Sequence, residues 1–188
     1  MTIKPALLHV FISTTLTMLL TACGGGGGGS SVGNNFSISG TAATDGAISD
    51  RTVEARCASG TGTATTNYDG TFVINVNNGN LPCILKAVDP VSNLELHSVV
   101  ESGATTTNIS PATELVTANL LGNTPALVFA NFTATSQQRI SSAAIATSVA
   151  TFQAATAALG SDADMTGIDV MKGALTAATE VASGNSAD

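Results

Sequence analysis

The chain has 188 residues, of which 13 are acidic and 6 basic, so its net charge is −7, and only 4% of its residues are aromatic. An acidic chain of this kind lacks the basic surface that binds nucleic acid or is attracted to anionic lipid, so neither partner is expected. The length suits one domain of ordinary size, or a small domain with an appendage.

The first 22 residues have the pattern of a secretory signal peptide. Lys4 supplies positive charge, and residues 6–20 are apolar apart from His9 and several hydroxyl side chains. A membrane-spanning helix needs about 20 strongly apolar residues, and this stretch is shorter and interrupted by hydroxyls. We therefore predict a signal peptide over residues 1–22.

The run Leu20-Thr21-Ala22-Cys23 resembles the lipobox of bacterial lipoproteins. The resemblance implies cleavage before Cys23 and attachment of diacylglycerol to its sulfur, and two or three acyl chains hold a protein on a membrane. The alternative is an ordinary signal peptide with a chance cysteine. Gly24 stands where Asp favours the inner membrane in this sorting scheme, so the resemblance places the protein on the outer membrane, either periplasmic or surface-exposed.

Beyond a Gly- and Ser-rich tether, which together with Cys23 occupies residues 23–35, apolar and polar residues alternate in short runs separated by turns. No helical pattern of the length found in βαβ units lies between these runs, so antiparallel β-structure is expected over residues 36–110. The seven expected strands are 36–40, 52–57, 62–66, 71–76, 83–88, 94–100 and 105–109.

Asp69-Gly70 is the strongest turn signal in the chain, because Gly accepts the positive φ that a hairpin requires. The alternative role for Asp69 is a cation ligand on a loop tip. Only Asn67 stands near it in the sequence to assist, so a turn is favoured.

Residues 38–41, 52–55 and 66–72, the last with the pattern Thr-x-x-Asp-Gly-x-Phe, look like the carboxypeptidase regulatory-like domain. The resemblance implies a seven-stranded antiparallel prealbumin-like β-sandwich and an accessory or adhesive module rather than an enzyme. Residues 47–50 depart from the pattern, because they lack its usual Pro or Gly. The two cysteines of this region and residues 108–116 also look like an uncharacterised group of exported bacterial lipoproteins.

Cys57 and Cys83 are the two cysteines other than the expected anchor. An exported protein meets an oxidising compartment, where a pair of cysteines is most simply a disulfide. Metal binding is the alternative, but no second cysteine pair and no clustered histidines accompany them.

From residue 110 the apolar period changes to about 3.6, which predicts an alanine-rich helical segment over residues 111–182. Ser110 as N-cap, Pro111 at the first helical position and Gly122 after the end predict a helix over 111–121. The other helices are expected at 125–132, 136–159 and 166–181, before a disordered polar tail at 183–188. The apolar stripe of the third helix is expected to pack mainly on the other helices, beside the β-domain.

Residue types that perform catalysis are scarce after the signal peptide. His97 is the one histidine there, it has no Gly-x-Ser-x-Gly elbow near it, and it is expected to be an ordinary strand residue. The acidic run 162–169 begins like a calcium loop, but Gly173 occupies the twelfth position, where Glu should close the shell; a helix-capping loop is favoured. No catalytic residue, metal or cofactor is therefore predicted.

These features together predict a membrane-anchored lipoprotein that acts as a non-catalytic binding or structural module of the cell envelope, with an envelope protein or a glycan as partner. The alternative is a carboxylate-dependent envelope hydrolase, in which two or more carboxylates would converge in a concave pocket.

Overall fold

The computed structural model describes residues 34–160, 164–178 and 184. The predicted signal peptide, the predicted lipidation of Cys23 and most of the predicted tether lie outside the described residues, as do most of the expected tail and the beginning of the acidic run. None of the helices in the described part of the chain is long and apolar enough to cross a membrane.

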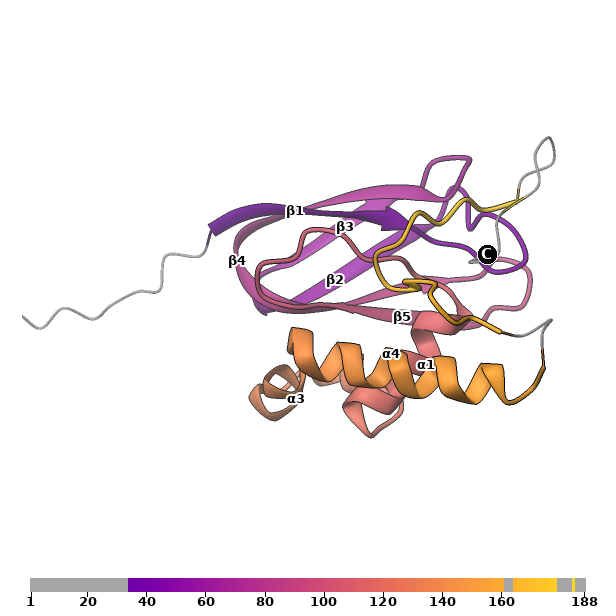
Figure 1. The fold of residues 1–188 in the computed structure, drawn as a ribbon. Coiled ribbons are helices and arrows are strands. Elements are labelled where there is room, and N and C mark those ends of the chain that lie inside the picture. The colour runs from indigo at the N-terminus through magenta and orange to yellow at the C-terminus, as the bar shows by residue number, and fades with distance from the viewer. Residues whose placement is uncertain (1–33, 161–163, 179–183, 185–188) are drawn as a thin grey trace, which may run out of the picture. The chain divides into compact units, whose positions relative to one another are not determined.

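Five strands among the described residues form one antiparallel sheet that curls strongly (Figure 1). The strand order is β1-β4-β2-β3, and β5 also pairs with β4. Residues alternate between buried and exposed along much of β2 and β4, as expected where one face of a strand packs on a core. The strands are β1 (Asn34–Thr41), β2 (Thr52–Ser59), β3 (Thr61–Thr65), β4 (Thr71–Val88) and β5 (Glu95–Val100).

The expected seven-stranded sandwich is wrong in strand number and in architecture. Residues 71–76 and 83–88, expected as two strands, belong to the single strand β4, while residues 105–109 make only isolated bridges. The Asn- and Gly-rich residues between them suggest a turn, yet the chain stays in the sheet there, with Asn78 at a φ of 51°. The first half of β4 pairs with β1 and the second half with β2 and β5, so the strands close into one curled sheet instead of two facing ones.

The main apolar core lies on the side of the sheet away from the helices, inside the curl. Gly40 allows the close approach of the chain that follows β5, because a Cβ atom there would lie 1.8 Å from the carbonyl oxygen of Thr107. The largest fully buried side chains of this core are Ile38, Ile48, Val53, Phe72, Ile74, Val76, Leu85, Leu96 and Ile109.

The predicted helix 111–121 is confirmed as α1 (Pro111–Leu121). The Ser110 side chain accepts a hydrogen bond from the backbone N–H of Thr113, the Thr113 hydroxyl accepts one from the backbone N–H of Ser110, and Gly122 ends the helix at a φ of 60°. The local sequence was sufficient to predict this helix, because its start and its end each carry a capping residue. The second helix, α2 (Pro125–Ala130), begins as expected at the next proline.

The helix expected over 136–159 is two helices, α3 (Ala134–Arg139) and α4 (Ser142–Ala157). Ile140 has an extended backbone, and the Ser141 side chain caps α4 by accepting a hydrogen bond from the Ala144 backbone. The helix expected over 166–181 is wrong: the described residues 164–178 contain turns and no helix. Asp164 and Asp169, which were expected in a helix-capping loop, accept backbone hydrogen bonds within these turns instead.

α1 and α2 pack on the sheet, and α4 packs on α1 (Figure 1). Ile84 of β4 and Val99 of β5 are paired across the sheet and point into the same apolar cluster as the helices. The cluster also contains Val116, Leu120, Val128, Phe129, Ile145, Val170 and Met171. The stripe expected on the third helix is only partly buried: Ile145 is buried, whereas Leu159 is 78% exposed.

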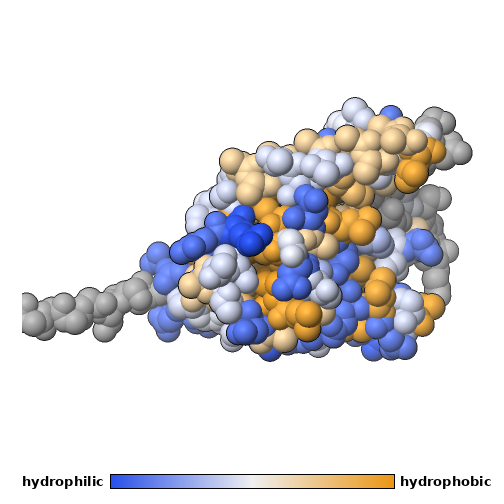
Figure 2. Space-filling view, turned by 90° about the horizontal axis from the view of Figure 1, so that it is seen from below, coloured by the Kyte–Doolittle hydropathy of each residue, from blue (hydrophilic) through white to orange (hydrophobic). Residues whose placement is uncertain are grey.

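The outward face of the helical layer mixes apolar and polar surface (Figure 2). Leu115 on α1 and Leu127 on α2 are both more than half exposed. Single exposed apolar residues of this kind are common on soluble proteins and carry no functional assignment by themselves.

Candidate functional site

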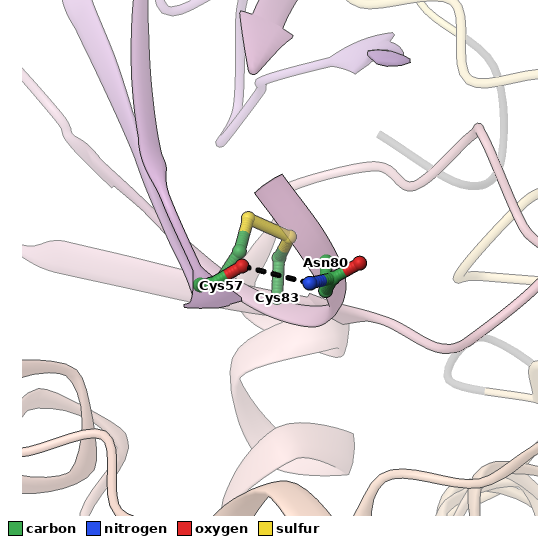
Figure 3. The surroundings of a disulfide bond; sticks show 4 residues. Cys57, Asn80 and Cys83 are labelled. Atoms are coloured by element: carbon green, nitrogen blue, oxygen red, sulfur yellow. Dashed lines mark hydrogen bonds between the residues drawn. A yellow bond between two sulfur atoms is a disulfide. The ribbon is translucent and has the colours of Figure 1, made fainter. Parts of the chain in front are cut away.

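Cys57 and Cys83 form a disulfide, as predicted (Figure 3). They face each other across the antiparallel pair β2 and β4, and both are buried. Beside them, the Asn80 side chain donates a hydrogen bond to the hydroxyl of Ser59 at 3.0 Å. Since both thiols are used in the disulfide, the alternative of a metal site at this pair no longer applies.

Asp69 and Gly70 lie in a tight turn between β3 and β4. Gly70 has a φ of 78°, and the Asp69 carboxylate accepts hydrogen bonds from the hydroxyl and the backbone N–H of Thr71. The Thr71 hydroxyl, together with its backbone N–H, holds the pKa of Asp69 below its usual value of 3.8. Asn67 also contacts Thr71, through its side-chain amide. The Asp69 carboxylate is therefore hydrogen-bonded within the turn, as a turn residue would be.

His97 is fully buried and links β5 to α1. Its Nδ1 lies 2.9 Å from Oε2 of Glu114, and its backbone N–H donates to the same oxygen. The Thr113 hydroxyl donates to the His97 carbonyl, and the ring of Phe129 lies 5.8 Å from the imidazole, centroid to centroid. His97 is thus a structural connection between sheet and helix. Nothing local in the sequence reveals Glu114 as a partner 17 positions away.

The ring of Phe129 forms a second connection between the helices and the sheet. The guanidinium of Arg56 lies 4.7 Å and the ammonium of Lys86 5.0 Å from its centroid, distances at which a cation is attracted to an aromatic face. Lys86 also pairs with Glu54 at 3.1 Å and with Glu95 at 3.7 Å. Two more carboxylates are therefore engaged in ion pairs on the sheet.

The described part of the acidic run forms turns. Asp164 accepts a hydrogen bond from the backbone N–H of Thr166, and hydrogen bonding with Thr166 lowers the pKa of Asp164. Asp169 accepts two more, from the backbone N–H groups of Met171 and Lys172. Among the residues that the structure describes, no three His, Cys, Asp or Glu side chains are grouped so that they could hold a metal ion.

A groove that the sequence did not indicate lies between α4 and residues 167–172, with a volume of about 400 Å³. Glu101, the residue after β5, reaches this groove while only 3% exposed. Its Oε1 accepts from the ammonium of Lys172 and, at 3.5 Å, from the hydroxyl of Ser142. Glu101 and Lys172 are 71 positions apart, so no local pattern signals this ion pair.

No protein-family model and no curated protein matches the chain. Its function is therefore inferred from the chemistry of its own residues.

Proposed function

We propose that this chain is a membrane-anchored lipoprotein, held on the outer membrane through Cys23, that acts as a non-catalytic binding or structural module of the cell envelope. The observation that carries the proposal is the disulfide between Cys57 and Cys83, because disulfides persist in exported proteins and are rare in reducing compartments. An apolar leader that ends at a lipobox-like cysteine supplies the route of export and the anchor.

The engagement of the carboxylates supports a binding role over catalysis. Asp69, Asp89, Asp164 and Asp169 each accept hydrogen bonds from residues two or three positions along the chain, which keeps them in turns. Glu114 is held by His97. An envelope protein or glycan is the proposed partner.

One observation favours the alternative of a carboxylate-dependent hydrolase: Glu101 and Asp169 line the same groove. A general acid and a general base must each be free to exchange a proton with the substrate or its water. Glu101, however, is paired with the Lys172 ammonium, and Asp169 accepts two backbone hydrogen bonds. Both groups are thus held by partners within the protein, which suits ligand binding better than proton transfer.

The anchor is tested by metabolic labelling with a fatty-acid analogue in the bacterial host. The wild-type chain and a Cys57→Ala, Cys83→Ala double variant should both carry the label, whereas Cys23→Ala should carry none and keep its leader. Label on the Cys23→Ala variant would contradict the proposal. A pull-down with the acylated protein from solubilised envelopes then identifies the partner, and hydrolysis of an envelope polymer by the purified protein would favour the alternative.

A further inference from the structure

A buried carboxylate with an unpaired oxygen is among the side chains that line the groove between α4 and residues 167–172. Glu101 is only 3% exposed, and its Oε1 accepts hydrogen bonds from Lys172 and Ser142. Its Oε2 is also buried and has no hydrogen-bond partner among the described residues. A buried acceptor without a donor is unfavourable, so a ligand that brings a donor to Oε2 gains a hydrogen bond of unusual value.

The walls of the groove are mainly apolar. Ile145 and Val149 of α4 face Ile168 and Met171 of the opposite segment. The volume of about 400 Å³ lies at the lower end of the range for small-molecule sites, so it suits a ligand of modest size with an apolar body.

The charges at the groove favour a cation over an anion. Two carboxylates, Glu101 and Asp169, line it together with one ammonium group, that of Lys172, which leaves a formal charge of −1. The chain as a whole carries −7, so the surrounding field has the same sign. A donor that is also positively charged makes a stronger, charge-assisted hydrogen bond to a carboxylate than a neutral hydroxyl does.

We propose that this groove binds a ligand that joins an alkyl or similarly apolar body to a primary ammonium group. The ammonium donates to Oε2 of Glu101, and the body packs on Ile145, Val149, Ile168 and Met171. The inference rests on the proposed role as a binding module, and it is independent of the anchor at Cys23.

The test uses the full purified chain in phosphatidylcholine nanodiscs, with the Ile and Met methyl groups labelled for NMR and three probes of equal length: hexylammonium, hexanol and hexanoate. Hexylammonium should shift the methyl signals of Ile145, Ile168 and Met171 saturably, with a dissociation constant of about a millimolar for a ligand of this size. Hexanol should bind about tenfold more weakly, because its hydrogen bond is neutral, and hexanoate should bind least. Titration of empty nanodiscs corrects for partition into lipid.

Two variants of α4 test the location without touching the ion pair. Ala146 lines the groove and is exposed, so Ala146→Phe should fill the space and weaken hexylammonium binding at least tenfold. Ala155 is also exposed and lies nine residues along, about 180° around the helix, so Ala155→Phe should bind as the wild type does. Glu101→Gln should abolish the preference for hexylammonium over hexanol.

Hexanoate binding as tightly as hexylammonium, or shifts that persist unchanged in Ala146→Phe, would overturn the inference. If Glu101→Gln does not fold, the Ala146→Phe and Ala155→Phe pair still decides the location, and the three probes decide the charge. Failure of this titration would leave acylation of Cys23 intact, and loss of acylation would leave the titration intact, so the two proposals fail separately.

Discussion

Two neighbouring residues of β4 report on opposite faces of the sheet. Ile84 points into the cluster shared with the helices, and Leu85 points into the core inside the curl. Both side chains are 0% exposed, and replacement of either by Ala removes three carbon atoms. The variants Ile84→Ala and Leu85→Ala therefore form a matched pair that asks whether the helices and the sheet unfold together.

The expected cost is similar for both variants. Each removed carbon group contributes about 0.8 kcal/mol of transfer free energy, so three contribute about 2.4 kcal/mol. The cavity that remains raises the loss in the free energy of unfolding to about 3–4 kcal/mol, within the range for Ile and Leu replaced by Ala in cores. The pairing of Ile84 with Val99 places the perturbation inside the sheet itself, so the loss should be felt on both of its faces.

Urea unfolding, followed by far-ultraviolet circular dichroism, measures the free energy, and hydrogen exchange locates the loss of protection. We expect one transition in each variant, with an unchanged dependence on urea and comparable loss of protection in residues 34–100 and 111–157. A different outcome would refute the reasoning: protection lost in the helices of Ile84→Ala while the strands remain as in the wild type. The helices would then be a separate cooperative unit.

Three further changes test local features. Protein taken from the envelope should show no alkylatable thiol at Cys57 or Cys83 before reduction, and replacing both by Ala should cost about 3–4 kcal/mol for a closed loop with a separation of 26; free thiols by mass spectrometry would contradict this. Gly40→Ala should cost about 2 kcal/mol or more in urea unfolding, because its Cβ would lie 1.8 Å from a backbone carbonyl oxygen, whereas Gly46→Ala, with its nearest atom at 3.4 Å, should be nearly neutral; equal midpoints would show that the approach relaxes freely. Hydrogen bonds from Ser92 hold the pKa of Asp89 below 3.8, so its carboxylate stabilises the fold above that pH, and the stabilisation disappears as the pH falls through the folded-state pKa. Asp89→Asn should therefore lower the urea midpoint at neutral pH and make the midpoint less sensitive to acid. An unchanged acid sensitivity would count against the assignment.

Features governed by neighbours in the sequence could be predicted from the sequence alone. The helix 111–121 was predicted with its observed bounds, because Ser110, Pro111 and Gly122 specify its two ends within a few residues. The disulfide was predicted from cysteine number and the expected compartment. The order of β-structure followed by helices was likewise evident from the change of apolar period.

Contacts between distant residues decided the rest. Residues 77–80 have the composition of a turn, but pairing with β1 and β2 on either side keeps the chain in the sheet, so two of the seven expected strands became one. Residues 105–109, another expected strand, make only isolated bridges. In the described residues 164–178, turns replace the expected helix 166–181. Val170 and Met171 are buried there in the apolar cluster that the helices share with Ile84 and Val99. The groove is formed because residues 167–172 return to lie along α4. Lys172 of this segment pairs with the buried Glu101, which stands 71 positions earlier in the chain. Local propensity amounts to a few tenths of a kcal/mol per residue, whereas each buried apolar side chain contributes about 1.5–3 kcal/mol, so burial determines the conformation wherever the two disagree.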